Sequence, residues 1–418
     1  MHTFTFIFLF FLTASVLARF WLNHRQVQHI RSHYDKVPPA FADKIQLVDH
    51  QRAADYNCTK LQFGRVLIAW EAIWLLLWTL AGGVDLIDRW WRDFEYSPLT
   101  TGLCVILSWL AFSACLNLPF SLYNTFVIEE RYGFNKTTWM TWFTDLFKST
   151  VLMLVIGVPL IAALLWLMNQ AGEHWWAYAW LLWLSFSLVM IWAYPTFIAP
   201  LFNQFTSLPN DSLRDRIENL LKDCGFHAEG VFVVDGSRRS SHGNAYFTGF
   251  GKNKRIVFYD TLLESLNEDE VEAVLAHELG HFKRHHIRKS LLVSGIMSLA
   301  GFAILAWLME SGWFYAALGV NTLSVHTALI LFLLAMPVFT YFISPVFAAL
   351  SRKHEFEADE FAHQNSNYKA LISALVNLYR DNASTLTPDP IHSGFYDSHP
   401  PASIRIDHLK AVAMKGSA

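Results

Sequence analysis

The chain has 418 residues, of which 53% are hydrophobic and only 16% are charged, and it contains 17 Trp and 34 Phe. This composition excludes an ordinary soluble protein and indicates a polytopic membrane protein, which contacts the lipid bilayer. The formal net charge of −3 and the lack of a basic tract argue against a nucleic-acid partner.

Seven apolar stretches are long enough to cross a bilayer, for which about 20 residues are needed. We therefore expect a mainly α fold. The first stretch has no basic leader region and no clear cleavage site, so we interpret it as a spanning helix rather than a signal peptide. The predicted spans are residues 3–22, 65–83, 99–119, 150–168, 175–198, 290–309 and 327–349.

Basic residues are distributed unevenly among the loops. Loops after the odd-numbered spans are rich in Lys and Arg, whereas those after the even-numbered spans offer only Arg89 and Arg92, beside several acidic residues. The positive-inside rule therefore places the N-terminus outside. It places the 24–64 loop, the 199–289 segment and the C-terminus in the cytoplasm.

Glu71 is an acidic residue within the second predicted span. An ionisable residue inside a membrane is a functional hint by default. An equally good explanation is that Glu71 lies near a boundary or pairs with Arg65 on the same helix.

The four cysteines are scattered and form no C-x-x-C pair. This spacing predicts no disulfide framework, which suits a reducing cytoplasmic face. It also argues against sulfur ligands for a metal ion.

Residues 205–289 are predicted to form a small α+β insert. Asp211 can cap a helix that runs to about Cys224. If the strand that starts near Asn244 lies at a sheet edge, it can pair with an extended peptide through main-chain hydrogen bonds. From its neighbours alone, Asn244 is more simply a turn residue after Gly243. The predicted strands are residues 231–234, 244–250 and 255–259.

A helix is predicted after this sheet without reference to any motif. Asn267 and Glu270 have the spacing of a capping box, and an apolar stripe follows them. The stripe consists of Val271, Val274, Leu275, Leu279 and Phe282.

The sequence HELGH occupies residues 277–281, near the end of this helix. Positions four apart share one face of a helix, so His277 and His281 can bind one metal ion while Glu278 stands beside it. This is the zincin pattern, in which two imidazoles hold Zn²⁺ and the glutamate activates water.

A five-residue pattern can arise by chance in a chain with 18 His, and a catalytic zinc site needs a third protein ligand. His285 lies about 12 Å from His277 along a helix, too far to share an ion, and we interpret it as a solvated helix end. Arg284 and Ile287 stand where the metzincin motif has its glycine and third histidine. The third ligand must come from elsewhere in the chain.

The last span continues into a helix on which Glu355 and Asp359 are four residues apart and share a face. One helical hairpin through the membrane returns this helix to the side of the histidine motif. Glu355 can then be the third ligand, and Asp359 can accept a hydrogen bond from a ligand histidine. Without the histidine motif, a solvated helix would explain both acids.

The C-terminal tail holds His399, in a Pro-rich loop, and Arg405, on a predicted helix. A lone histidine in such a loop is usually a surface residue. A zinc peptidase, however, needs a group opposite Glu278 that stabilises the oxyanion, and His399 or Arg405 could supply it.

Taken together, the residues resemble the type I CAAX prenyl endopeptidases, integral-membrane zinc proteases of the gluzincin type. The resemblance runs in order from the first loop to near the end of the chain, and seven spans are what that family has. The segments that carry it are residues 125–130, 133–136, 198–203, 244–247, 254–257, 277–281, 351–352, 355–356, 358–359 and 399–401.

The resemblance implies that His277, His281 and Glu355 bind Zn²⁺, that Glu278 is the catalytic base and that Asp359 supports a ligand. These roles match what the spacing allows.

It further implies that the strand containing Asn244 and Ala245 binds the substrate backbone. His399 and Arg405 are implied to lie near the reacting carbonyl.

The implied fold has seven transmembrane helices around a water-filled chamber, with the zinc site facing inward at the cytoplasmic end. We expect four parts: residues 1–204 with spans one to five, the metalloprotease insert 205–289, spans six and seven in 290–350, and cytoplasmic helices in 351–418 that complete the site.

The implied substrates are peptides or proteins, with prenylated CAAX C-termini in eukaryotes, from which three terminal residues are released. Bacterial relatives have no established prenylated substrate. The tail has no obvious dilysine signal, which favours a bacterial inner membrane over the endoplasmic reticulum. The alternatives are a heat-shock-type membrane metalloprotease, which has four spans, and a transporter or lipidated-peptide-binding scaffold with a non-catalytic zinc site.

Overall fold

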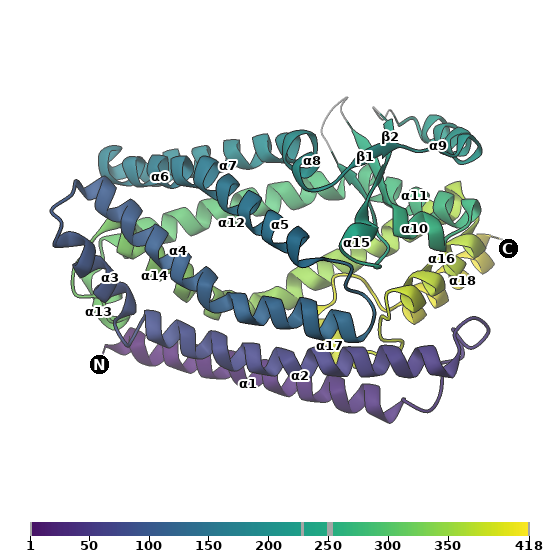
Figure 1. The fold of residues 1–418 in the computed structure, drawn as a ribbon, viewed down its shortest axis with the longest axis horizontal. Helices are drawn as coiled ribbons and strands as arrows, with labels where there is room; N and C mark the ends of the chain where they lie inside the picture. Colours follow the sequence, from purple (N-terminus) through teal and green to yellow (C-terminus); the bar gives the residue numbers. More distant parts are fainter. Residues whose placement is uncertain (1, 227–229, 249–253, 417–418) are drawn as a thin grey trace.

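A computed structural model describes residues 2–226, 230–248 and 254–416. Seven of the described helices are long and apolar enough to cross a membrane, as the sequence predicts, and they run along the long axis of the molecule (Figure 1). Three are uninterrupted, namely α1 (Thr3–Ser32), α2 (Leu47–Trp78) and α12 (His286–Met309). The others are α4 (Pro98–Tyr123) with η1 (Asn124–Glu129); α5 (Trp139–Leu152) with η2 (Met153–Gly157) and α6 (Val158–Gln170); η3 (Gly172–His174) with α7 (Trp175–Ala193), η4 (Tyr194–Ile198) and α8 (Ala199–Phe202); and α14 (Val325–Thr340) with η6 (Tyr341–Ile343) and α15 (Ser344–Asn365).

Several of these helices extend well beyond the predicted spans, because an apolar stretch marks only the part of a helix that lies in lipid. α2 begins at Leu47 and ends at Trp78, whereas the prediction was 65–83. Its polar first half packs against the end of α1, where Arg31 Nη1 donates to Asp55 Oδ1 at 2.9 Å.

The spans close into a ring through contacts of α1 with α2, α4 with α6, α6 with α7, α7 with α12, α12 with α14 and α14 with α1. Aromatic contacts such as Trp70 with Phe120, at 5.4 Å between ring centroids, join α2 to α4. At one end, α3 (Gly83–Arg92) and α13 (Gly312–Ala317) complete an apolar core with the spans. The zinc motif and the sheet lie toward the other end (Figure 1).

A cavity of about 430 Å³ lies among α1, α2, α4 and α14, and Glu71 lines it. Glu71 Oε2 is 2.7 Å from Nη2 of Arg19 on α1. The predicted pairing with Arg65 is wrong, because Arg65 donates to Asn23 Oδ1 at 2.9 Å instead. A charged pair is costly in lipid, which explains why both side chains lie between helices.

The insert contains a four-stranded sheet in the order β1-β2-β4-β3, with β2 and β4 parallel and the outer pairs antiparallel. Three strands were predicted, and the position of β3 at the edge is confirmed. β1 was not predicted, because three residues are too few for an alternating pattern. Gly249 and Phe250, predicted to belong to β3, lie outside the described residues. The strands are β1 (Phe205–Ser207), β2 (Gly230–Val234), β3 (Ala245–Thr248) and β4 (Arg255–Tyr259).

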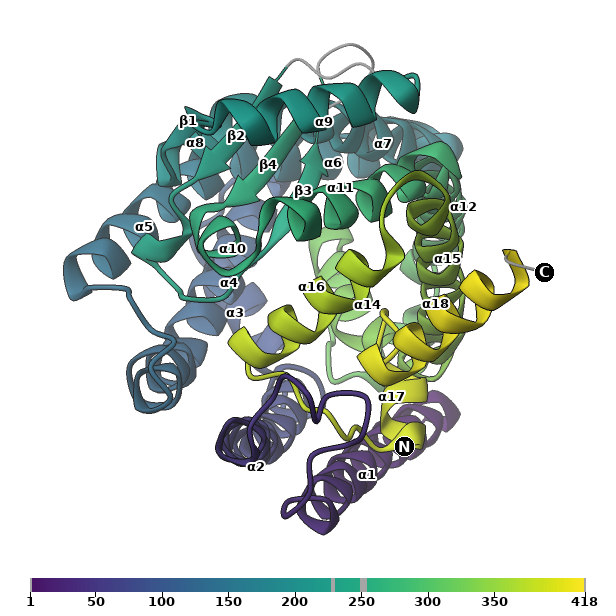
Figure 2. The same ribbon diagram turned by 90° about the vertical axis from the view of Figure 1, so that its right-hand side faces the viewer.

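α9 (Asp211–Asp223) covers one face of the sheet (Figure 2). Its N-cap is not Asp211, as predicted, but Asn210, whose Oδ1 accepts from Leu213 N at 3.1 Å. Both residue types are good N-caps, and only the geometry distinguishes them.

α11 (Glu268–Lys283) carries the HELGH motif and follows the short η5 (Gly236–Arg238) and α10 (Asp260–Ser265). The predicted capping box is confirmed, since Glu270 N donates to Asn267 Oδ1 at 3.0 Å and Asn267 N to Glu270 Oε2 at 3.1 Å. The apolar stripe of α11 packs into a core with α9 and the sheet.

The helices after α15 fold back onto the insert. They are α16 (Tyr368–Asp381), α17 (Pro390–Tyr396) and α18 (Ala402–Gly416). Leu371 and Leu409 share the core of α9 and α11. The insert and the tail, which are separate parts in the predicted domain scheme, thus pack around one core.

α11 and α15 cross closely at Gly280. A methyl group at Gly280 would lie 2.8 Å from Ala358 Cα and 3.0 Å from Ala358 O. The glycine of the motif therefore has a packing role: it lets the two helices approach without a side chain between them.

We predict that Gly280→Ala forces α11 and α15 apart. Overpacking of this kind costs about 1–3 kcal/mol, so the unfolding temperature in detergent should fall, and bound metal should fall with it. Gly312→Ala is the control, because nothing lies within 4 Å of a methyl group there. Equal unfolding temperatures for the two variants would contradict the packing role.

Candidate active site

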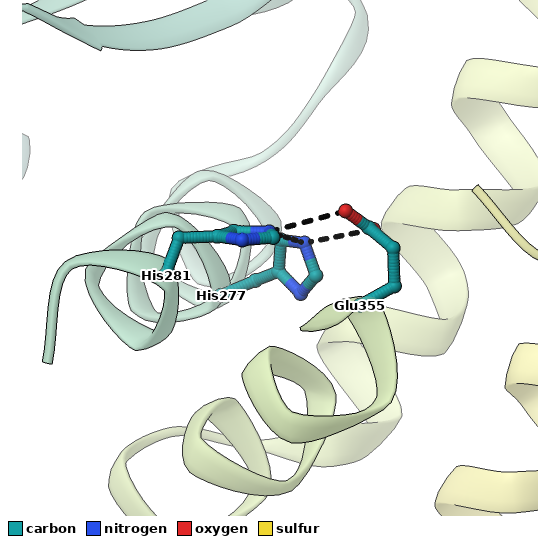
Figure 3. Close-up of side chains that lie close together, drawn as sticks. All are labelled: His277, His281 and Glu355. Atoms are coloured by element: carbon teal, nitrogen blue, oxygen red, sulfur yellow. Dashed lines mark hydrogen bonds and ion pairs between the residues drawn. The ribbon is translucent and has the colours of Figure 1, made fainter. Parts of the chain in front are cut away.

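Two helices bring the three predicted metal ligands together (Figure 3). His277 and His281 project from α11 and Glu355 from α15, and one ligand atom from each lies within 4.8 Å of the others. His281 Nε2 is 3.3 Å from His277 Nε2 and 3.2 Å from Glu355 Oε1, and His277 Nε2 is 3.4 Å from Glu355 Oε2.

This donor set fits a metal ion. Glu355 is only 2% exposed, and its buried Oε2 has no hydrogen-bond partner among the described residues. The charged groups nearest to this oxygen, His277 Nε2 at 3.4 Å and Arg405 Nη1 at 3.5 Å, make longer contacts. A buried carboxylate oxygen that makes no hydrogen bond is unfavourable, and a cation held with the two imidazoles would satisfy it. Three protein ligands would leave one position open, as in catalytic sites.

Asp359 lies one turn beyond Glu355 on α15 and fixes the ring of His277. Its Oδ1 is 2.9 Å from His277 Nδ1, the nitrogen that faces away from the ligand cluster. The carboxylate also accepts from Arg405 Nε at 2.9 Å and Nη2 at 2.6 Å. Asp359 is fully buried, so the Arg405 guanidinium compensates a charge that water cannot reach.

Opposing influences act on the pKa of His277. Burial and the nearby Arg405 guanidinium lower it, but contacts with the carboxylates of Asp359 and Glu355 outweigh them and raise the pKa to about 9. Without a metal ion, His277 therefore holds a proton at neutral pH.

Glu278, the predicted base, is partly exposed beside the buried His277. His399 lies on the open side of the cluster. Its side chain is 64% exposed and its Nε2 is 3.3 Å from Glu355 Oε1.

His286 is a residue of the site that the sequence analysis missed. Its Nδ1 is 3.1 Å from His281 Nδ1, and its Nε2 is 2.9 Å from Glu357 Oε2. It thus supports the second histidine as Asp359 supports the first. The run of two histidines after the motif was the available signal, but only His285 was considered. His285 is exposed, as predicted.

Arg352 was also missed. From α15 it donates to the carbonyl oxygens of Asp397 at 2.7 Å, Gly394 at 3.1 Å and Ser393 at 3.4 Å. These bonds hold the chain that leads to His399 against the helix that carries Glu355.

Asn244 stands where the edge strand β3 begins. Its carbonyl oxygen accepts from Tyr259 N at 2.9 Å, and its own Oδ1 accepts from Ala245 N at 2.8 Å. Asn244 thus has the local hydrogen bond of a turn residue and also starts the edge strand. Among the described residues, β3 pairs with β4 on one side and with no strand on the other.

Two protein-family models together match most of the chain. The model of the CAAX prenyl protease N-terminal region, with five membrane helices, matches residues 26–204, and the model of peptidase family M48 matches residues 207–413.

Curated relatives are CAAX prenyl proteases. The chain is 40% identical to CAAX prenyl protease 1 homolog of Arabidopsis thaliana, covering 80% of this chain and 78% of that protein, and 37% identical to the Homo sapiens homolog with the same coverage. It is 32% identical to CAAX prenyl protease 1 of Saccharomyces cerevisiae, covering 94% of this chain and 92% of that protein. The crystal structure of S. mikatae Ste24p superposes with a TM-score of 0.89 at 29% identity, covering 98% of this chain and 99% of that one.

The raised pKa of His277 predicts the pH dependence of metal affinity. A metal ion must displace the proton, so affinity of the metal-free protein for Zn²⁺ should rise between about pH 6.5 and 9 and level off above it. Displacement of one proton can change the affinity for Zn²⁺ by at most about tenfold per pH unit. Competition with a calibrated chelator measures this.

Asp359→Asn should flatten this dependence, because it removes one of the two carboxylates that raise the pKa. Glu360→Gln, at the next position of α15, alters a carboxylate that pairs with His408 at 3.5 Å and should leave the slope unchanged. A wild-type affinity independent of pH would contradict the argument.

Proposed function

The chain belongs to peptidase family M48 and is an integral-membrane metalloendopeptidase of the CAAX prenyl protease type, and from that premise we propose that its metal is Zn²⁺. The observation that carries the proposal is the convergence of His277, His281 and Glu355 within 4.8 Å. Two imidazoles and one carboxylate suit zinc, whose catalytic sites take three protein ligands and keep a fourth position open.

In the proposed mechanism Glu278 is the base. Zn²⁺ held by His277, His281 and Glu355 would polarise the peptide carbonyl and lower the pKa of water to about 7. Glu278 takes a proton from the attacking water and returns it to the leaving amine. Water supplies the hydroxyl for the new carboxylate, so no covalent intermediate with the protein is needed.

The groups around the ligands have separate proposed roles. His399, whose exposed side chain lies 3.3 Å from Glu355 Oε1, is the proposed donor to the oxyanion that forms at the carbonyl. Arg405, expected from the resemblance to lie near the reacting carbonyl, is buried against Asp359 and Glu355. Its proposed role is to compensate the charges of these two carboxylates. Asp359 and His286 orient the two ligand histidines, since an outer partner fixes ring orientation and tautomer.

We propose that the substrate is the C-terminal segment of a CAAX-type peptide, prenylated on its cysteine, which adds to the outer edge of β3 at Asn244 and Ala245. The names of the relatives and the position of β3 support this substrate class. Strand addition gives affinity through main-chain hydrogen bonds and presents an extended peptide to the metal.

The proposed orientation has the active site on the cytoplasmic side. Residues 24–64, which comprise the end of α1, the loop to α2 and the start of α2, carry the Lys and Arg noted above. They lie at the same end of the molecule as the insert (Figure 1), and the positive-inside rule supports a cytoplasmic position for both. The preference for a bacterial inner membrane stays a prediction; the relatives reported above are eukaryotic.

We expect Glu278→Gln to retain metal and lose about 10²–10⁴-fold in kcat, because general-base catalysis contributes that much. Glu355→Ala should instead lose the metal. Elemental analysis beside a peptide-cleavage assay distinguishes the two. A metal-loaded Glu278→Gln protein with normal activity would refute the base assignment, and normal zinc in Glu355→Ala would move the third ligand elsewhere.

The substrate class is tested with a farnesylated CAAX peptide and its unprenylated twin, incubated with detergent-purified protein. Chelator-sensitive release of the terminal tripeptide, faster from the farnesylated peptide, is expected. The Glu278→Gln protein, purified identically, controls for contaminating peptidases. If zinc-loaded protein cuts neither peptide, the proposed substrate is wrong while the fold and family stand.

A further inference from the structure

The segment 239–244 leads directly into β3 and is held by the membrane spans. Ser241 N donates to Phe134 O at 3.2 Å, and Lys136 N donates to Arg239 O at 3.0 Å. Asn135 and Ser240 form a β-bridge. The short run that follows the third span thus pairs with the backbone that precedes the proposed substrate strand.

Arg239 anchors the same segment to the fourth span. Its guanidinium donates to both carboxylate oxygens of Asp145, from Nε at 2.8 Å and from Nη2 at 2.9 Å, and from Nη1 to Asn203 Oδ1 at 2.7 Å. These hydrogen bonds attach the insert directly to the ring of spanning helices.

His242 makes the side-chain part of this junction. Its ring stacks on Phe134 at 4.3 Å between centroids and 19° between planes. Its Nε2 lies 3.6 Å from Glu129 Oε2. Glu129 ends η1, the continuation of the third span, so the spanning helix reaches within two residues of Asn244.

Glu129 is itself fixed. Its carboxylate is 16% exposed and accepts from Tyr56 OH of α2, which lies 2.8 Å from Oε1 and 3.0 Å from Oε2; Lys60 Nζ is 3.5 Å from Oε1. Its carbonyl oxygen accepts from Phe134 N at 2.8 Å. The carboxylate that faces His242 is thus held by two spans.

The tail holds the other side of this segment. Gly243 N donates to Asn382 Oδ1 at 3.0 Å, and Asn382 Nδ2 donates back to Gly243 O at 3.3 Å. Thr261 Oγ1 donates to His242 O at 3.0 Å. The ring of spans, the tail and α10 therefore all contact the segment that precedes β3.

We propose that Glu129 and His242 are positioning residues that set the height of the β3 edge above the membrane and thereby determine which peptide bond is cut. The inference rests on the proposed function, and it takes the prenyl chain of the substrate to stay at the bilayer and so to anchor one end of the peptide. An extended peptide advances about 3.3 Å per residue, so a small shift of the edge brings a neighbouring bond to the metal. A slip of one residue also reverses the side-chain faces.

The test is the choice of cleaved bond in a farnesylated CAAX peptide, measured by mass spectrometry together with kcat and KM. We expect His242→Ala to lose about tenfold to a hundredfold in kcat/KM, since misplacement by about 1 Å has effects of this size. Products from neighbouring bonds should increase. Glu129→Gln should show a smaller effect in the same direction, and metal content and unfolding temperature should stay unchanged in both.

Matched variants separate positioning from folding. Glu130→Gln, the same change one residue later, alters an exposed side chain that contacts Asn135 and should behave as wild type. His242→Phe keeps a ring against Phe134 and should recover most of the bond choice. The double variant of Glu129 and His242 should be no worse than His242→Ala, because contacting residues are not additive.

Two results would overturn the inference alone: normal cleavage by wild type with an unchanged bond choice in His242→Ala, or a loss of activity that follows loss of stability with the bond choice retained. Failure of zinc-loaded wild-type protein to cut any CAAX peptide would overturn the proposed substrate, and the inference with it.

Discussion

The close crossing of α11 and α15 determines much of what surrounds it. With Gly280 against the backbone of Ala358, the two helices bring a pair of histidines and a pair of carboxylates into one buried volume. Buried carboxylates are costly unless they are paired, and Arg405 from α18 provides the pairing. The tail must therefore fold back onto the insert, and the shared core of α9, α11, α16 and α18 follows from that requirement.

The attachment of the insert to the ring follows a similar logic. Two contacts attach the insert to the ring, and each uses a carboxylate from a spanning helix that continues beyond the predicted span. Asp145 contacts Arg239, and Glu129 contacts His242. Extended helices thus have a purpose that hydropathy does not show. Their extensions carry Asp145 and Glu129 to positions at which the insert contacts them.

Features that depend on local spacing could be predicted from the sequence. The spans, the capping box and the face shared by His277 and His281 all arise within one helix, and Glu355 followed from the hairpin that returns the chain. Features that depend on contacts between distant segments could not. His286 stands in a run of two histidines after the motif, but neither that run nor the position of Arg352 indicates which groups these side chains contact. Their partners appear only when the helices are packed.

Glu71 and Asn210 show the same limit at smaller scale. Glu71 could pair with Arg65 on its own helix or with Arg19 on α1, and the structure shows the pair with Arg19. Two adjacent residues could cap α9, and backbone conformation selected Asn210. In each case a partner of the right kind was among the interpretations considered, but its identity depended on coordinates that spacing does not give.

The dependence of the metal site on Arg405 has a consequence for biosynthesis. A ribosome makes both histidines, Glu355 and Asp359 before it makes Arg405, so a nascent chain can hold every ligand while its buried carboxylates still lack their counter-charge. The counter-charge arrives only when α18 docks. The segment containing Arg405 must therefore leave the exit tunnel before the two carboxylates are paired.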